Sequence, residues 1–388
     1  MLGNNSRFSH NPAAADSGVR VFDTIAALRL NSESIKTAIV KTYSGTAGIG
    51  GGQYIYDSSD STTADNGGTC IVDGAGRRFK LFYANDGEIT DDQFGCVGDE
   101  TTDDTTQMTK FYQSAMELPG VRHRIRPLRY KITSLPDITV SNVILVGTGG
   151  IGAKCTTGGT TLCWYGSAGA TIHSITSVSG ASNYQIKNIT YKNIVYDCRS
   201  VAAKSVHIAS VFQSEIHLGE IEATSKGFEV NVVASLIDVR DTQENDFLFY
   251  GYQMTNAAPV LWLDGDSGAN TSLNKIRVIV VHKNASAVVC ANSDNNSWPF
   301  VRTYCAAGGS ASYSVELRGG SSSALSCRDE KFNSYVATNK PIHAFGTNEG
   351  YAVASVNHTI SGRDLGNGTP TPTKGTGASI SEATMTAL

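Results

Sequence analysis

The sequence predicts an all-β protein whose main part is built from many short strands. Glycine accounts for 40 of the 388 residues and charged residues for only 17%, a composition that favours strands and turns over helices. From Tyr130 to about Arg363, short apolar or alternating runs are separated by Gly, Asn and Ser. Helical periodicity is nearly absent from this interval, so the pattern predicts a sandwich, a barrel or a solenoid.

Charge, hydropathy and cysteine spacing exclude several classes of protein. The net charge of −4 gives no reason to expect nucleic acid or an anionic membrane surface as a partner. The longest apolar runs, such as Ile276–Val281, are far too short to span a bilayer, and the N-terminus lacks the apolar core of a secretion signal. None of the eight cysteines forms a Cys-x-x-Cys pair or a zinc-type cluster, so we expect free thiols in a reducing cytosol, no metal site and no cofactor.

The first 90 residues predict an arm followed by a small β-rich module. Residues 1–20 are small and polar, as in an extended arm, and the apolar spacing in Val21–Leu30 predicts a short helix. Alternating runs predict strands in Thr37–Ser44 and Gln53–Ser59. The runs CIVD and RFKLFYA complete the module, which covers residues 21–90.

Four carboxylates crowd the stretch FGCVGDETTDDTTQMTKFYQSA, which begins at Phe94. Asp103 or Asp104 is well placed to cap a helix over Thr105–Glu117, and acidic residues suit the positive end of a helix dipole. The residue order of a calcium-binding loop is missing. The stretch therefore predicts turns and the start of a helix rather than a metal site.

Strand spacing favours a solenoid within the all-β class. The motifs EIHL, IDVR and LWLD place His217, Arg240 and Asp264 at intervals of 23 and 24 residues, which suits one coil of a parallel β-solenoid with strands stacked about 4.8 Å apart. The repeat is weak, and periodicity alone leaves a β-sandwich open. After Gly362 the chain becomes rich in Gly, Thr and Pro, so we expect the solenoid at residues 91–362 and a linker or extended tail at residues 363–388.

Several segments in the first 150 residues resemble one protein family. VFDTIAALR, GGGQYIYDSSDSTTADNGGTCIV, GRRFKL and ITDDQFGCVGDETTDDTTQMTKF are similar to the N-terminal portion of bacteriophage tailspikes of the pectate-lyase-like superfamily. In that family an F-G-A-x-G-D-G-x-T-D-D-T segment opens a helix that caps a right-handed parallel β-helix. The residues that fit are Phe94, Gly95, Gly98, Asp99 and Thr102–Thr105, whereas Cys96 and Glu100 depart from the pattern, as Leu128 does in the coil that follows.

The resemblance implies both a fold and a place of action. It implies a right-handed parallel β-helix with a short N-terminal capping helix, assembled as a homotrimer at the tip of a phage tail and meeting a capsular or O-antigen polysaccharide of bacteria. Such a virion protein is made in the host cytoplasm and leaves by lysis, which agrees with the missing secretion signal. Residues 1–20 have the length of an anchor peptide for another tail protein, although a start without function is an equal alternative.

The outward side chains of three expected strands form the candidate site. Glycoside hydrolysis needs two carboxyl groups, about 5–5.5 Å apart for retention or about 6.5–9.5 Å apart for inversion, and residues one coil apart on a solenoid meet this spacing. If the apolar residues of the three motifs face the core, alternation sends the polar ones outward. The candidates are Glu215, Asp238 and Asp264 as catalytic acids, with His217, Arg240 and Trp262 as substrate-binding residues. Further carboxylates on neighbouring strands or turns are Glu220, Glu222, Glu229, Asp241, Glu244 and Asp246.

The sequence leaves more than one function open. The exterior of any solenoid is polar, so an ion-paired surface without a catalytic role is the alternative interpretation of these residues. A hydrolase that degrades the glycan is compatible with the pattern, and so is a tail protein that only binds the glycan or another tail component. Lyase chemistry has less support because no Arg-x-Pro-x-x-Arg occurs, and a secreted carbohydrate-active enzyme is disfavoured by the missing signal.

Overall fold

The computed structural model of the chain contains two compact units that divide between Val97 and Gly98. The predicted boundary, between residues 90 and 91, lies close to this division. The structure describes residues 18–46, 48–83, 87–152, 158–177, 185–232, 241–265, 271–320, 327–338, 340–349, 351–364 and 372–387. Residues 1–17 of the expected N-terminal arm lie outside these ranges, so its role as a tail anchor stays a prediction.

Among its described residues, the N-terminal unit forms a small five-stranded sheet with one short α-helix. The predicted strands are present, but the predicted helix over Val21–Leu30 is wrong in its first part. Val19–Thr24 is a strand, and Thr24 then starts the helix by accepting a hydrogen bond from the Ala27 amide at 3.1 Å. The elements are β1 (Val19–Thr24), α1 (Ile25–Arg29), β2 (Thr37–Thr42), β3 (Gly52–Tyr56), β4 (Cys70–Val72), β5 (Arg78–Leu81), β6 (Ile89–Thr90) and a 3-10 helix (Asp91–Phe94). The sheet order is β1-β2-β3-β5-β4, with β1 and β2 parallel and the other neighbours antiparallel.

A polar turn fixes the connection between β3 and β4. Asn66 accepts a hydrogen bond from the Gly68 amide at 3.1 Å, and Arg29 at the end of α1 donates twice to the Asp65 carboxylate, at 2.7 and 2.9 Å. Glycine is required at position 68 because a Cβ there would lie 2.4 Å from the ring of Phe94. The DNGGT motif is therefore a structural turn in which side chains replace regular backbone pairing.

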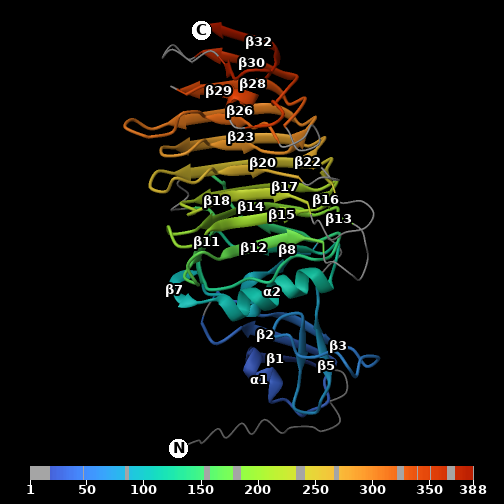
Figure 1. The fold of residues 1–388 in the computed structure, drawn as a ribbon. Coiled ribbons are helices and arrows are strands. Elements are labelled where there is room, and N and C mark those ends of the chain that lie inside the picture. Colours follow the sequence, from blue (N-terminus) through green and yellow to red (C-terminus); the bar gives the residue numbers. More distant parts are fainter. Residues whose placement is uncertain are drawn as a thin grey trace, which may run out of the picture. The chain divides into compact units, whose positions relative to one another are not determined.

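The unit that begins at Gly98 is a parallel β-helix, as predicted. Strands of successive coils stack into three parallel sheets, and Figure 1 shows these coils lying rung upon rung from the helix α2 (Thr105–Glu117) toward the C-terminus. Alternate residues of the longer strands are apolar and buried, as Phe247 and Phe249 are, so the core lies inside the coils between the sheets.

The three sheets are named here by their strands, in stacking order. Sheet I contains β8 (Arg122–Ile125), β10 (Ile144–Gly147), β14 (Thr190–Asp197), β17 (Glu215–Ile221), β20 (Asp246–Gln253), β23 (Lys275–His282), β26 (Ser297–Cys305), β28 (Lys331–Thr338), β30 (His358–Asp364) and β32 (Ile380–Ala387), with β7 (Asp99–Asp103), β9 (Arg129–Ile132) and β11 (Thr160–Trp164) alongside. Sheet II contains β12 (Thr171–Thr176), β15 (Lys204–Ala209), β18 (Lys226–Asn231), β21 (Leu261–Leu263), β24 (Val288–Cys290), β27 (Val315–Leu317), β29 (Ile342–Ala344) and β31 (Thr373–Lys374). Sheet III contains β13 (Ile186–Lys187), β16 (Val211–Phe212), β19 (Thr242–Gln243), β22 (Thr271–Ser272) and β25 (Ser293–Asp294).

The predicted capping helix is present with the predicted limits, as α2. Its buried face, which includes Tyr112, packs on the first coil. The acidic residues before it serve turns, as expected: Asp103 accepts a hydrogen bond from the first helical amide, and Asp104 accepts one from the Gly98 amide, both at 3.0 Å. Across the described residues, no group of three or more His, Cys, Asp or Glu side chains is arranged to hold a metal ion.

The chain enters the strands of sheet I through a left-handed corner residue followed by a buried residue. The corner residues have φ between 47° and 63°, a region that costs most L-residues about 1–2 kcal/mol and is easiest for Gly, Asn and Asp. All but one of the described corners are polar, the exception being Leu273. This corner row consists of Asn142, Asn188, Gln213, Glu244, Leu273, Asn295, Asp329 and Asn357.

The buried residues that follow four of these corners form an asparagine ladder inside the β-helix. The side-chain nitrogen of Asn245 donates to the side-chain oxygen of Asn274 at 2.9 Å, and Asn274 donates in the same way to Asn296 at 3.1 Å. Glu330 is the last rung and accepts a hydrogen bond from Asn296 at 2.9 Å. Because each rung ties two coils together, the ladder fixes the backbone at the corners beside it.

The β-helix continues beyond its predicted end at residue 362. The strand β31 pairs with β29, and β32 pairs with β30, both in parallel. The tail expected at residues 363–388 therefore includes the strands of a further coil. The prediction of a linker rested on the Gly, Thr and Pro content of this segment, and that composition does not distinguish an extended tail from the short strands and turns of a last coil. A trimer contact in this region stays a prediction.

Candidate functional site

The structure divides the candidate residues between two sheets. Glu215 and His217 lie on β17 of sheet I, whereas Trp262 lies on β21 of sheet II and Asp264 follows that strand. The expected outer strip is therefore wrong as an arrangement. It assumed coils of 23 and 24 residues, but Glu215 pairs with Asp246, 31 positions later. Outside the described residues lie Asp238 and Arg240, whose roles stay predictions.

Trp262 is already engaged in contacts of its own on sheet II. Lys226 Nζ lies 4.4 Å from the ring centroid of Trp262, and the Arg318 guanidinium carbon lies 4.6 Å from it, so two cations contact the indole. The indole nitrogen donates to the Asp264 carboxylate at 3.2 Å, and Arg318 also pairs with Glu316 at 2.8 Å. These residues form a closed network of cation–π contacts and ion pairs.

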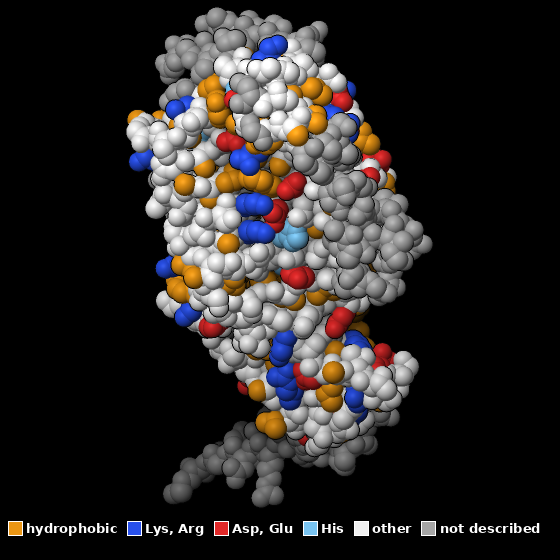
Figure 2. Space-filling view, in the orientation of Figure 1, with side chains coloured by type: hydrophobic (Ala, Val, Ile, Leu, Met, Phe, Trp, Pro, Cys, Tyr) orange, Lys and Arg blue, Asp and Glu red, His pale blue; other side chains and the backbone are white. Residues whose placement is uncertain are grey.

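Sheet I instead gathers charged side chains from several consecutive coils. Figure 2 shows acidic, basic and histidine side chains close together on the face of the β-helix turned to the viewer. The register pairs Glu215 of β17 with Asp246 of β20, and His217 with Leu248, which in turn pairs with Arg277 of β23. We call Glu215, His217, Asp246 and Arg277 the charged cluster, with Lys192 of β14 and Lys275 of β23 at its edges.

One histidine nitrogen lies close to both carboxylates of the charged cluster. His217 Nε2 lies 3.6 Å from a carboxylate oxygen of Glu215 and 3.8 Å from one of Asp246. These two oxygens are therefore separated by no more than about twice the longer distance. That limit covers the spacing of about 5–5.5 Å used by retaining glycosidases and the lower part of the range of about 6.5–9.5 Å used by inverting ones. The two carboxylate oxygens are therefore no farther apart than the range of inverting enzymes allows.

Asp246 is held in its ionised form. Burial on its own would raise the pKa of this carboxyl, but the Arg277 and Lys275 side chains outweigh burial and lower its pKa below the usual value. Arg277 donates to Asp246 at 2.7 Å, and Lys275 donates at 3.2 Å. Asp246 therefore has the charge state of a base or a nucleophile at neutral pH. Glu215 contacts Lys192 and is the more exposed carboxylate of the two.

His217 is neutral in this arrangement. Burial lowers the pKa of its imidazole, and the positive charges of Arg277 and Lys192 lower it further against the opposing effect of Glu215 and Asp246. Arg277 donates to His217 Nε2 at 3.0 Å, which leaves the ring proton on Nδ1. The histidine therefore helps to hold the arginine against Asp246.

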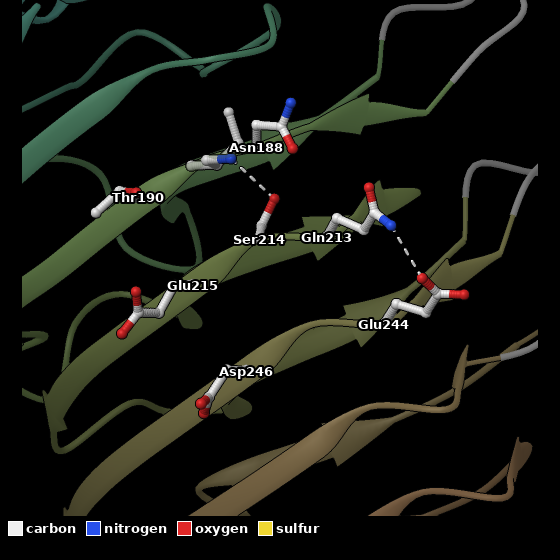
Figure 3. Close-up of a pocket in the computed structure, with 8 residues that line it drawn as sticks. Asn188, Thr190, Gln213, Ser214, Glu215, Glu244 and Asp246 are labelled. Atoms are coloured by element: carbon white, nitrogen blue, oxygen red, sulfur yellow. Dashed lines mark hydrogen bonds between the residues drawn. The ribbon is translucent and has the colours of Figure 1, made fainter. Parts of the chain in front are cut away.

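A pocket of about 550 Å³ opens at the start of the strands that carry these carboxylates. Figure 3 shows Glu215 and Asp246 side by side on neighbouring strands, with the corner residues Gln213 and Glu244 at the same edge. Gln213 donates to Glu244 at 3.1 Å. The lining is polar throughout most of its surface, as expected for a site that binds hydroxyl groups, and consists of Asn188, Ile189, Thr190, Gln213, Ser214, Glu215, Glu244 and Asp246.

Farther along the same strands, the outer face of sheet I becomes apolar and aromatic. Tyr250 pairs with Ile279, and Tyr252 pairs with Val281, which in turn pairs with Tyr304. These outward residues are partly exposed, and Tyr304 reaches 50%. A surface that combines tyrosine rings with nearby carboxylates suits the alternating apolar faces and hydroxyl edges of sugars.

The sequence pattern identified Asp246 only as one of several further carboxylates and did not identify Arg277, although a signal for both was present. Alternation in DFLFYGYQM puts Asp246 in phase with outward Tyr250, and alternation in KIRVIVVH puts Lys275 in phase with Arg277. What alternation lacks is the length of each coil, which decides which outward residues become neighbours.

Among the described residues, no helix is long and apolar enough to cross a membrane.

Comparisons with known proteins agree with the resemblance found in the sequence. Residues 21–84 match the family described as phage tail protein small four-stranded beta-sheet domain. Over 108 residues the chain is 30% identical to the Mu-like prophage FluMu defective tail fiber protein of Haemophilus influenzae, a match that covers 28% of this chain and 17% of that protein. The chain therefore spans only a small part of this relative.

Two solved structures share the fold. The tailspike protein of Acinetobacter baumannii phage AM24 matches with a TM-score of 0.50 and 16% identity, over 92% of this chain and 65% of that one. ORF18 of Geobacillus virus E2 matches with a TM-score of 0.50 and 13% identity, over 96% of this chain and 74% of that one. The chain spans less than two thirds of the AM24 tailspike. The chain thus contains a segment at residues 21–84 that is similar to a phage tail β-sheet domain, and it shares its overall fold with the AM24 tailspike.

Proposed function

We propose that this protein is a phage tailspike that binds a bacterial surface polysaccharide, either a capsule or an O-antigen, and cleaves it by hydrolysis during adsorption. The observation that carries the proposal is the register of Glu215 with Asp246, which puts two carboxylates of neighbouring coils at 3.6 and 3.8 Å from one histidine nitrogen. Two carboxyl groups on neighbouring strands that line one pocket can flank a glycosidic bond, as glycoside hydrolysis requires. The polar pocket in front of the pair supplies room for a sugar.

The two carboxylates take different roles in the proposed reaction. Asp246, kept ionised by Arg277 and Lys275, either takes a proton from the water that attacks the anomeric carbon or attacks that carbon itself to form an intermediate that water then hydrolyses. Glu215, on the adjacent strand and more exposed, is the group that protonates the leaving oxygen. Arg277 fixes the position of Asp246 and, through His217, the position of the whole cluster. The tyrosines beyond the cluster support neighbouring sugar rings of the polymer.

The setting of this activity is a phage particle. We propose that the chain acts as a homotrimer in the virion tail, after synthesis in the cytoplasm of the host bacterium. Residues 1–20 would join it to another tail protein. These proposals are supported by the phage tail domain at residues 21–84 and by the tailspike-type fold.

A second function, binding without cleavage, has one specific observation in its favour. Both carboxylates of the pair are already in ion pairs, Glu215 with Lys192 and Asp246 with Arg277. An ion-paired glutamate gives up its role as a proton donor unless the substrate displaces the lysine. In this alternative, the charged cluster and the tyrosines only hold the glycan.

The test uses the full chain and purified polysaccharides. Capsules and O-antigens from a panel of bacterial strains are incubated with the protein, and new reducing ends and released oligosaccharides are measured by mass spectrometry. Glu215→Gln and Asp246→Asn should each lower the rate of release by at least about a hundredfold, the usual effect of removing a general acid or base. Glu316→Gln is the matched control, because Glu316 also pairs with an arginine, Arg318, but on sheet II.

The possible results distinguish hydrolysis at the charged cluster from binding without cleavage. Release of oligosaccharides that both pocket variants abolish and the control retains supports hydrolysis at the charged cluster. Full activity in both pocket variants overturns the site. Binding of a polysaccharide without release of any product removes the hydrolase and leaves the binding function. Absence of both binding and release across the panel, including the glycan of the strain on which the phage grows, overturns both functions.

A further inference from the structure

One apolar side chain interrupts the otherwise polar corner row. Leu273 is 56% exposed, so burial in the core does not account for it. Its φ of 54° lies in the left-handed region, which Gly, Asn and Asp adopt more readily than leucine. The next corner along the row is Asn295, with φ of 55°, so the same backbone accepts the more favourable residue one coil away. Leucine at this corner therefore has neither a packing nor a conformational explanation.

Register puts Leu273 beside the pocket. Gln243 of β19 pairs with Ser272 of β22, and Asp246 pairs with Lys275, so Leu273 stands one coil beyond Glu244. Glu244 lines the pocket together with Asp246. Neighbouring coils of a parallel sheet are about 4.8 Å apart, so the leucine side chain is within reach of a ligand held by these carboxylates.

We propose that Leu273 is a specificity residue that contacts a methyl group of the glycan bound in the pocket. This inference rests on the proposed function, because it requires a sugar at the charged cluster. Unfavourable backbone conformations gather at sites that bind ligands, so the left-handed φ of Leu273 next to the pocket supports a role in binding. Sugars present methyl groups in two common forms, in an N-acetyl group or as C6 of a 6-deoxy sugar. The polar corners Gln213 and Glu244 suit the hydroxyl groups of the same ligand.

Saturation-transfer NMR on the full chain tests the contact with two matched pairs of sugars. The pairs are N-acetylglucosamine against glucose, and L-fucose against L-galactose, and only the first sugar of each pair carries a methyl group. In one of the two pairs we expect the sugar with the methyl group to bind about fourfold more tightly, because burial of roughly one methyl group contributes that much. The methyl protons of this sugar should show the strongest saturation. The pair that shows the preference identifies the source of the methyl group.

Three variants make the test specific to Leu273. Leu273→Asn should abolish the preference and leave the melting temperature equal or higher, because asparagine tolerates the left-handed backbone. Leu273→Met should keep the preference, because it keeps an apolar side chain. Asp329→Asn changes another residue of the corner row, two coils farther on, and should alter neither property.

The outcomes distinguish this inference from the function on which it rests. An unchanged preference in Leu273→Asn, or equal binding of both sugars in each pair, overturns it. A changed oligomeric mass of Leu273→Asn with unchanged sugar binding also overturns it, since the leucine would then be a subunit contact. If Asp246→Asn abolishes polysaccharide cleavage or binding while Leu273→Asn changes nothing, the inference fails and the proposed function stands. If no sugar or polysaccharide binds at all, both fail.

Discussion

Replacing Asn274 by alanine removes four hydrogen bonds from the interior of the β-helix. The Asn274 side-chain oxygen accepts from the backbone amide and the side-chain nitrogen of Asn245, at 3.1 and 2.9 Å. Its nitrogen donates to the Thr242 carbonyl at 2.9 Å and to Asn296 at 3.1 Å. The site is buried, so Asn274→Ala leaves the backbone N–H of Asn245 and one of its two side-chain N–H groups without an acceptor, while the other still donates to the Val211 carbonyl. Each unpartnered buried donor costs about 1–3 kcal/mol, so we expect the free energy of unfolding to fall by about 2–6 kcal/mol.

Guanidinium-induced unfolding of the whole chain measures this loss. Tryptophan fluorescence reports on the β-helix, because all the tryptophans of the chain (Trp164, Trp262 and Trp298) belong to it. The control is Asn284→Ala, which removes an exposed hydrogen bond to the Thr255 carbonyl and should change the free energy of unfolding by no more than about 0.5 kcal/mol. If Asn274→Ala unfolds at the same denaturant concentration as the control, the ladder does not stabilise the coils and the reasoning is refuted.

Two further predictions concern the end of the ladder and the N-terminal unit. Burial raises the pKa of Glu330 from 4.5 to about 7, against the opposing hydrogen bonds from Trp298 and Asn296, so the unfolded chain loses this proton at lower pH than the folded one. The free energy of unfolding should therefore fall by about 3 kcal/mol as the pH rises from 4.5 to 7. Urea unfolding at several pH values measures this fall, and the Glu330→Gln variant should not show it. In the N-terminal unit, Gly68→Ala puts a Cβ 2.4 Å from the Phe94 ring and should cost about 1–3 kcal/mol. Calorimetry should show a lower melting temperature for this variant, whereas Gly18→Ala, with no atom within 4 Å of its added Cβ, should melt like the parent protein.

Local signals in the sequence were sufficient for elements that depend on a few consecutive residues. The helix over Thr105–Glu117 was predicted with the observed limits, since its cap, its start and its apolar face are all written within one segment. The helix expected over Val21–Leu30 was half wrong because β1 is held by pairing with β2, for instance Val21 with Ile39, and such pairing overrides a local helical pattern.

The candidate site could be predicted only in part, because it depends on coil length. Outward alternation correctly identified Glu215 and His217 as neighbours on one strand. Their partners on the next coil depend on how many residues the coil contains, and this number varies: Lys275 pairs with Ser297, 22 positions on, whereas Ser297 pairs with Lys331, 34 positions on. The connections between strands carry no periodic pattern, so sequence spacing could not show that Asp246 is the residue next to Glu215.

In this fold the asparagine ladder stabilises the coils, whereas the side chains of the corner row are free to vary with the ligand. The corner backbone keeps φ between 47° and 63° whether the residue is Asn, Gln, Glu, Asp or Leu, so the corner side chain does not decide the local conformation. At the four corners beside the ladder, the buried residue that follows holds the backbone, through hydrogen bonds such as those from Asn245 to Asn274. A corner side chain can therefore change with little effect on the coil beneath it. Gln213 and Glu244 line the pocket, and Leu273 occupies the next corner of the row, so under the proposed function substitutions at these corners alter which glycan is bound while the β-helix is preserved.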